Sequence, residues 1–245
     1  MVYNKIIERY NKGCKQLAFL IDPDKFSLEQ IPELNTIFQE AKPDILLIGG
    51  SLVSVDTTKL IDELKKTLNI PVVLYPGSSI QVCSGVDAML FLSLISGRNP
   101  EFLISHHVAA APLIKANNIE AISTGYMLVD GGSHTSVQYM SQTQPIPRDK
   151  YDIAVATALA GQYLGMKMIY MDAGSGARQA ISSEMITLVK SALDVPLIIG
   201  GGIRTEDQLL SACKAGADIV VVGNVFEKDL GLLKSFCRTL TNVNK

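Results

Sequence analysis

Eight short apolar segments recur along this chain, and they constrain its fold more than any other feature. They cover residues 16–21, 45–48, 72–74, 88–92, 120–125, 168–171, 197–199 and 219–222. Several are apolar without interruption, as in residues 219–222, which is typical of parallel strands covered on both faces. Longer amphipathic segments separate them. This alternation predicts parallel strands joined by crossover helices.

The segments between the strands carry apolar residues at helical spacing. One such set is Leu28, Ile31, Leu34, Ile37 and Phe38. Eight strand–helix units in 245 residues predict an α/β fold, namely one closed (β/α)8 TIM barrel in which residues 1–245 form a single domain.

The segment after the third expected strand is an exception to the alternation. Residues 75–86 are few and include Pro76, Gly77 and Gly85, which disfavour a full helix. We therefore expect a loop in place of one helix of the outer ring.

Composition limits the classes of partner. The formal net charge is −2 and the isoelectric point is near 5.9, so we expect no broad cationic face and no nucleic-acid partner. Residues 1–15 contain neither the apolar core of a signal peptide nor a membrane span, and a cytoplasmic location is expected.

Four cysteines, at positions 14, 83, 213 and 237, lie far apart in the sequence. They form no CxxC or Cys/His pattern of the kind that binds zinc. We expect reduced, mostly structural thiols.

Glycine-rich segments follow the last three expected strands. Residues 173–177 read AGSGA, residues 200–204 read GGGIR, and Gly223 precedes Asn224. In a barrel these segments lie at the carboxyl ends of the strands, where glycine lets backbone N–H groups approach an anion closely. The pattern predicts a phosphate site, although tight turns that need glycine for geometry alone remain an alternative. Arg204 is either a further phosphate ligand or a solvated residue at a helix start.

Oxygen-bearing side chains follow the first two expected strands. Asp22, Asp24 and Lys25 come directly after the first, and Ser51 follows the second. Carboxylate and hydroxyl oxygens suit Mg²⁺, which usually binds through one or two carboxylates together with substrate phosphates. A turn with helix capping explains the two aspartates equally well. Lys25 is expected to be a surface charge or a charge near the phosphate.

Other candidate groups carry less information. His106 and His107 fall in an expected helix, His134 has no evident partner, and no Ser/His/Asp arrangement is visible. Lys167 precedes the sixth strand, so it should lie at the opposite end of the barrel from the site. The polar segment 130–149 is either a mobile lid or an ordered surface excursion.

Seven motifs in order, spread over residues 18–227, resemble the geranylgeranylglyceryl phosphate synthase family, which includes the bacterial heptaprenylglyceryl phosphate synthases. The motifs are LIDPDK, IGGS, YPGSS, ISTGYMLVDGG, IYMDAGSGA, LIIGGGIRT and VVGNVFE. GGGIR recurs in many phosphate-binding barrels, whereas LIDPDK combined with AGSGA is far more selective.

The resemblance implies an Mg²⁺-dependent prenyltransferase that joins sn-glycerol 1-phosphate to a polyprenyl diphosphate through an ether bond. It implies that Asp22 and Ser51 hold Mg²⁺, and that Asp172 is the base while Tyr170 positions the glycerol. The family usually has Glu where this chain has Asp172, so the carboxylate reaches less far by one methylene. Glycerol phosphate is expected at Tyr170, Met171, Asp172, Ala173, Gly174, Ser175, Gly176, Gly201, Gly202, Gly223 and Asn224.

The prenyl chain, expected to be geranylgeranyl, needs an apolar groove. Segment 75–86 with Leu92, Leu94, Ile95 and Tyr126 is the candidate, although ordinary barrel packing also explains each apolar residue. The family implies a homo-oligomer, either a dimer or a hexamer. A lipid product implies transient contact with a membrane surface.

Two other functions remain open from the sequence. One is an isomerase, a lyase or a thiamine-phosphate-synthase-like transferase on the same phosphate-binding barrel, because fold alone does not determine function. The other is a non-catalytic barrel that binds a phosphate ligand.

Overall fold

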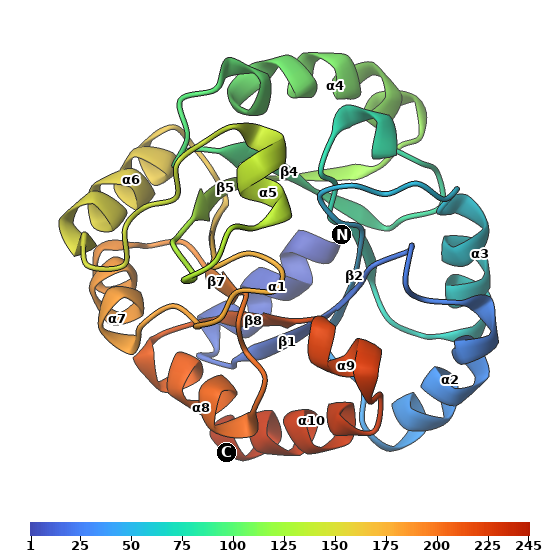
Figure 1. Ribbon diagram of the computed structural model, residues 1–245. Helices are drawn as coiled ribbons and strands as arrows, with labels where there is room; N and C mark the ends of the chain where they lie inside the picture. Colours follow the sequence, from blue (N-terminus) through green and yellow to red (C-terminus); the bar gives the residue numbers. More distant parts are fainter.

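Eight parallel strands close into a single barrel in the computed structural model, which describes residues 1–245 (Figure 1). Neighbours in sequence are neighbours in the sheet, and β8 pairs with β1 to close it. The strands are β1 (Gln16–Ile21), β2 (Ile45–Ile48), β3 (Val72–Leu74), β4 (Ala88–Leu94), β5 (Glu120–Leu128), β6 (Met168–Asp172), β7 (Leu197–Gly200) and β8 (Ile219–Val222). The predicted (β/α)8 barrel is confirmed.

Four strands extend further toward their carboxyl ends than their sequence pattern indicates. They are β4, β5, β6 and β7. Parallel pairing continues past the apolar runs, with Leu94 opposite Tyr126 and Leu128 opposite Asp172. Residues that read as loop in the sequence are therefore fixed by sheet hydrogen bonds.

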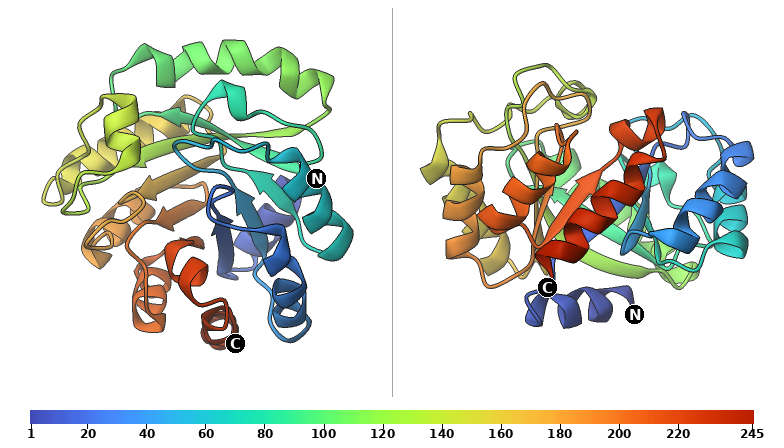
Figure 2. Two further views of the ribbon diagram at one scale, coloured as in Figure 1. Left: turned by 45° about the vertical axis from the view of Figure 1, so that its right-hand side comes forward. Right: turned by 90° about the horizontal axis from the view of Figure 1, so that it is seen from below.

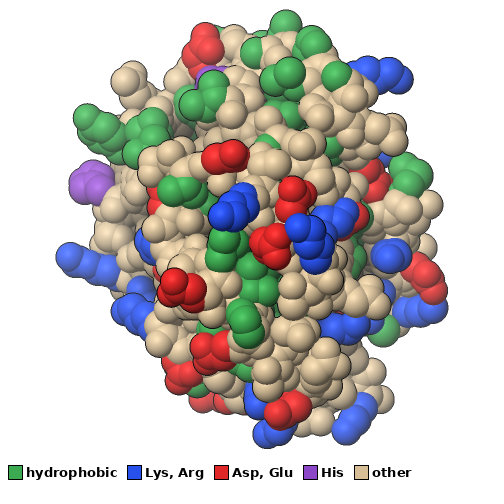
Figure 3. All heavy atoms as spheres, turned by 90° about the vertical axis from the view of Figure 1, so that its right-hand side faces the viewer, with side chains coloured by type: hydrophobic (Ala, Val, Ile, Leu, Met, Phe, Trp, Pro, Cys, Tyr) green, Lys and Arg blue, Asp and Glu red, His purple; other side chains and the backbone are tan.

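A ring of helices surrounds the barrel. Its members are α2 (Ile31–Glu40), α3 (Thr58–Thr67), α4 (His106–Ala116), α6 (Tyr151–Tyr163), α7 (Ser183–Ala192), α8 (Glu206–Ala215) and α10 (Leu232–Val243). Between β3 and β4 there is only one 3₁₀ turn, Ser79–Gln81, so the predicted loop in place of a helix is confirmed. On the face that includes α3, acidic and basic side chains are interspersed (Figure 3).

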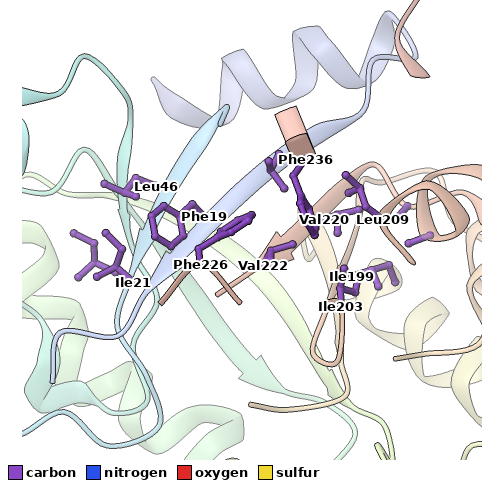
Figure 4. Close-up of a cluster of buried hydrophobic side chains, with 14 of the residues drawn as sticks. Phe19, Ile21, Leu46, Ile199, Ile203, Leu209, Val220, Val222, Phe226 and Phe236 are labelled. Atoms are coloured by element: carbon purple, nitrogen blue, oxygen red, sulfur yellow. The ribbon is translucent and has the colours of Figure 1, made fainter. Parts of the chain in front are cut away.

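Hydrophobic packing outside the barrel positions the short helix that follows β8 at the carboxyl-terminal rim. The short helix α9 (Asn224–Lys228) carries Phe226, whose ring packs edge-on against Phe19 at 5.2 Å and against Phe236 at 5.1 Å (Figure 4). These buried rings join β1, α9 and α10. The packing anchors Asn224 and Glu227, which lie on α9 at the barrel mouth.

The amino-terminal end of the barrel is covered by α1 (Val2–Asn11), which lies across it (Figure 2). Val2 and Ile6 are buried among the side chains of the barrel interior. The Glu120 carboxylate, at the start of β5, accepts hydrogen bonds from the N–H groups of Val2 and Tyr3. Because this end is covered, the carboxyl ends of the strands form the accessible end.

Segment 130–149 folds over the barrel mouth and contains a short helix, α5 (Ser136–Ser141) (Figure 1). Thr135 caps this helix by accepting a hydrogen bond from Gln138 N, and Val129 forms an isolated bridge with Ile146. The structure thus describes an ordered excursion, and movement of the segment stays a prediction. None of the helices combines the length and hydropathy needed to span a bilayer.

Candidate active site

A polar cavity opens at the carboxyl ends of the strands. It has a volume of about 1020 Å³, open solvent included, and is lined by loops after β1, β2, β6, β7 and β8. Eleven of the residues that the sequence points to line this one cavity. They are Asp22, Ser51, Tyr170, Asp172, Gly174, Ser175, Gly176, Gly201, Gly202, Gly223 and Asn224.

Two further predicted residues do not line the cavity. Met171 alternates with Tyr170 and Asp172 along β6, so its side chain packs into the layer between barrel and helices. Ala173 is also buried in that layer. Because both side chains point away from the cavity, only their backbone atoms could contact glycerol phosphate as predicted.

Backbone N–H groups at the glycine loops are available to an anion. The amides of Ser175, Gly176, Gly201 and Gly202 donate no hydrogen bond to another backbone group. All four residues line the polar cavity. Consecutive unpaired N–H groups in turns are typical anion sites in proteins.

Gly201 explains why this arrangement needs glycine. Its φ of +77° lies in the left-handed region, and a Cβ built there would be 2.6 Å from Asp172 Oδ1 and 2.7 Å from Gly174 N. The loops after β6 and β7 therefore meet backbone to backbone.

Arg204 holds these two loops together. Its guanidinium donates to the carbonyl oxygens of Ala177 and Arg178 in the β6 loop. The side chain also borders the cavity. Arg204 is exposed and lies two residues before α8, as one of the two interpretations predicts, and the carbonyl acceptors in the neighbouring loop are what the sequence does not reveal.

Asp172 is the buried carboxylate of the cavity. It is 6% exposed, its Oδ1 accepts from Gly174 N at 2.8 Å, and its Oδ2 accepts from the hydroxyls of Tyr126 at 2.6 Å and Tyr75 at 3.3 Å. No Lys, Arg or His forms an ion pair with it. Burial raises the pKa of Asp172, and the three hydrogen bonds oppose that rise.

The three tyrosines around Asp172 form one aromatic cluster. The ring centroids of Tyr75, Tyr126 and Tyr170 are 5.4 to 6.5 Å apart. Burial is the largest effect and, together with the nearby charge of Asp172, raises the pKa of each tyrosine well above its usual value, so all three remain hydrogen-bond donors.

Sequence reasoning missed two of these contacts. Tyr75 and Tyr126 are the donors to Asp172, whereas the sequence suggests Tyr126 only as a wall of an apolar groove. The available signal is position: Tyr75 directly follows β3, and Tyr126 is opposite Tyr170 in the pairing of β5 with β6.

The Asp22 corner lies across the cavity mouth. Lys25 Nζ is 2.7 Å from Asp22 Oδ2 and 3.6 Å from Glu227 on α9. Asp24 points elsewhere and accepts hydrogen bonds from the N–H groups of Ser54 and Val55, which fixes the loop after β2. Burial, the largest effect, raises the pKa of Glu227.

The donors at this corner fit Mg²⁺ only when substrate supplies further ligands. Asp22 and Ser51 offer hard oxygen atoms in one cavity, and Glu227 adds a nearby carboxylate. No group of three or more His, Cys, Asp or Glu side chains is arranged to hold a metal ion. Such a set suits an ion that is shared with a diphosphate.

An apolar groove of about 760 Å³, open solvent included, adjoins the polar cavity. It runs between the loop after β3 and α4, where the missing ring helix leaves space. Tyr75, Leu92, Leu94 and Tyr126 line it as predicted. Ile95 does not, because its Cδ1 packs toward Gly125 and Gly161 between β5 and α6.

The two cavities share part of their walls. Gly50, Ser51, Tyr75, Tyr126 and Val137 line both. A ligand with a polar head and an apolar tail can therefore occupy both.

The three histidines and Lys167 lie outside the polar cavity. His107 is buried and lies 3.0 Å from Ser93 Oγ through its Nε2, while exposed His134 lies 3.3 Å from Gln138. His106 borders the apolar groove. Lys167 lies over the ring of Tyr3 at the amino-terminal end, which confirms its predicted place.

Comparisons with known proteins agree with this geometry. Residues 9–241 match the PcrB family. The geranylgeranylglyceryl phosphate synthase of Chitinophaga pinensis is 51% identical over 95% of this chain and 93% of its own length. The enzyme of that name from Thermococcus kodakarensis is 44% identical over 85% of this chain and 83% of its own.

One solved structure extends the likeness to the whole chain. It is the (S)-3-O-geranylgeranylglyceryl phosphate synthase of Thermoplasma acidophilum in complex with its substrate sn-glycerol 1-phosphate. The two structures superpose with a TM-score of 0.92 at 29% sequence identity, over 99% of each chain.

Proposed function

The chain belongs to the PcrB family, and from that premise we propose that it is a prenyltransferase that joins sn-glycerol 1-phosphate to geranylgeranyl diphosphate. The reaction forms an ether bond and releases diphosphate. One observation supports this function above all others: a polar cavity with unpaired amides adjoins an apolar groove, and Asp172 lies at their junction beside Tyr75 and Tyr126.

The glycerol substrate occupies the polar cavity. Its phosphoryl group accepts hydrogen bonds from the free amides of the β6 and β7 loops, with Gly223 and Asn224 closing the third side. Tyr170 and Asp172 on β6 then face the glycerol hydroxyls. This anchoring holds the reacting hydroxyl near the carboxylate.

The prenyl chain occupies the groove between the β3 loop and α4, so its diphosphate end lies near Asp22 and Ser51. Asp172 accepts the proton of the glycerol hydroxyl as that oxygen bonds to the allylic carbon. Diphosphate leaves with the electron pair of the broken C–O bond. A base that works this way must be ionised, and the hydrogen bonds to Asp172 favour that state.

Asp22 and Ser51 would hold Mg²⁺, and the chemistry supplied there would be neutralisation of the negative charge on the departing diphosphate. With this function we also expect the chain to associate into a dimer or hexamer and to contact a membrane surface transiently.

The test is the reaction itself. Purified protein is incubated with Mg²⁺, labelled sn-glycerol 1-phosphate and prenyl diphosphates of several lengths, and butanol extracts are separated by chromatography. We expect a labelled lipid that depends on the prenyl substrate and is lost with sn-glycerol 3-phosphate. Absence of any labelled lipid at every chain length contradicts the proposed function.

A further inference from the structure

We propose that Tyr126 is the positioning residue of Asp172, and that Tyr75 is an exchangeable donor whose place on Asp172 Oδ2 is taken by the reacting glycerol hydroxyl. The inference rests on the proposed function. It assigns distinct roles to two side chains that lie on the wall shared by the polar cavity and the apolar groove.

The two hydrogen bonds to Oδ2 differ in length. The Tyr126 hydroxyl lies 2.6 Å from Oδ2, which is the short distance of a charge-assisted bond, whereas the Tyr75 hydroxyl lies 3.3 Å away. A weaker donor is the one that an incoming hydroxyl displaces more easily. Tyr126 therefore stays on the carboxylate while substrate replaces Tyr75.

The other carboxylate oxygen is fixed by the main chain. Oδ1 accepts from Gly174 N at 2.8 Å. With Tyr126 on Oδ2 and Gly174 on Oδ1, the carboxylate is held at both ends and cannot rotate freely. This matters because an aspartate has one methylene fewer than a glutamate, so its oxygen must be held in the right place by its neighbours.

Sheet pairing fixes Tyr126 on both sides, whereas Tyr75 is bonded to one neighbouring strand only, through its N–H to Ile48 O at 2.7 Å. Tyr126 lies within β5, directly opposite Tyr170 of β6. Tyr170 in turn lies two residues before Asp172 on the same strand. Tyr75 lies just beyond β3, at the start of the loop that replaces a ring helix. The donor that must stay is therefore on a strand, and the donor that must yield is on a loop.

The surroundings of Asp172 contain no second charge. The phenols of Tyr75 and Tyr126 contact it from the β3 loop and β5, and Tyr170 lies beside it on β6. β7 contributes Gly200, and the loop after it contributes Gly201. Because no cation neutralises Asp172, its ionised form depends on these hydrogen bonds.

In the reaction, the glycerol O–H bond breaks as the new C–O bond forms, and its proton moves to Asp172 Oδ2 while the allylic C–O bond releases diphosphate. Tyr126 keeps its own proton and donates throughout. Asp172 later returns its proton to solvent, which restores the starting state.

The experiment compares Tyr126→Phe and Tyr75→Phe with Tyr139→Phe, whose side chain is 83% exposed on α5. The pKa of Asp172 is followed by ¹³C NMR with carboxyl-labelled aspartate, and Asp172→Asn identifies the resonance. The pH profiles of kcat and kcat/KM are measured in parallel, and thermal melting verifies folding.

We expect Tyr126→Phe to raise the pKa of Asp172, because it removes a hydrogen bond to the ionised form. The acid limb of kcat/KM then moves to higher pH, and kcat falls roughly tenfold at neutral pH. Tyr75→Phe should shift the pKa and the limb less, and Tyr139→Phe should shift neither.

An Asp172 resonance that titrates alike in wild type and Tyr126→Phe overturns the inference, whether or not the wild type makes lipid. A larger effect from Tyr75→Phe than from Tyr126→Phe overturns it as well. Lack of lipid synthesis by the wild type instead removes the proposed function, and the NMR titration distinguishes the two failures.

Discussion

Lys25 Nζ lies 2.7 Å from Asp22 Oδ2 and also reaches Glu227, so one ammonium group neutralises the corner where Mg²⁺ is proposed. The lysine is half exposed and can move away into solvent. A metal ion that approaches Asp22 must therefore compete with Lys25, which lowers its apparent affinity.

The first prediction follows from this competition. Lys25→Met should bind Mg²⁺ more tightly than the wild type in the absence of substrate, because Asp22 then lacks a fixed cation. Asp22→Asn should bind it more weakly, and Lys59→Met, an exposed lysine of α3, should leave it unchanged. Titration with Mn²⁺ as a paramagnetic substitute, followed by Mg²⁺ displacement, measures the affinities. Equal affinity in Lys25→Met and wild type contradicts the competition.

The second prediction concerns the contact of the β6 and β7 loops. Gly201→Ala should weaken glycerol 1-phosphate binding at least tenfold and destabilise the fold by about 1–3 kcal/mol, because the new Cβ meets Asp172 Oδ1 and Gly174 N. Gly13→Ala is the control, since its φ of +70° imposes similar strain but no atom lies within 4 Å of its Cβ. Calorimetric titration and urea unfolding measure both effects. If Gly201→Ala binds glycerol 1-phosphate as tightly as the wild type, the β7 loop is not part of the phosphate site.

The sequence predicts the architecture well because barrel strands are buried on both faces. Uninterrupted apolar runs such as residues 219–222 reveal such strands directly, and Pro76 and Gly77 reveal the missing helix. The end of β5 is harder to predict, because Gly125 reads as a strand terminus. In the structure, a Cβ at Gly125 would lie 2.7 Å from Met166 Sδ and 2.8 Å from Ile95 Cδ1, so the glycine marks close packing inside the strand.

The backbone part of the candidate site is predictable from sequence, and its side-chain partners are not. Glycines at 201 and 202 predict a loop at the carboxyl-terminal rim, and both residues line the polar cavity. The contact of Tyr126 with Asp172 spans 46 residues and depends on the register of β5 and β6, which no local pattern encodes. The same holds for Lys25 and Glu227, which meet only when the barrel closes.

The third prediction concerns the apolar groove. Ala110 lies on the buried side of α4 and lines the groove, so Ala110→Phe should fill part of it. Synthesis with geranylgeranyl diphosphate should then fall much more than synthesis with a shorter prenyl diphosphate. Ala109→Phe is the matched control, because Ala109 is the preceding residue on the same helix and is exposed. Comparison of kcat/KM across chain lengths measures the effect, and an equal loss at all lengths means that the chain lies elsewhere.

The last prediction uses the ionisation of Asp172 to connect stability with catalysis. Burial raises the pKa of the folded carboxyl above its ordinary value of 3.8, so this group favours the folded state below that value and loses that contribution as pH rises through the folded pKa. The free energy of unfolding of the wild type, relative to Asp172→Asn, should therefore fall as pH rises from about 4 toward neutrality. Urea unfolding at several pH values measures the difference, and Asp152→Asn on α6 is the control because it lies on the outer ring. A difference that stays constant with pH means that Asp172 ionises as readily in the folded protein as in the unfolded chain, so that the three hydrogen bonds fully offset the effect of burial.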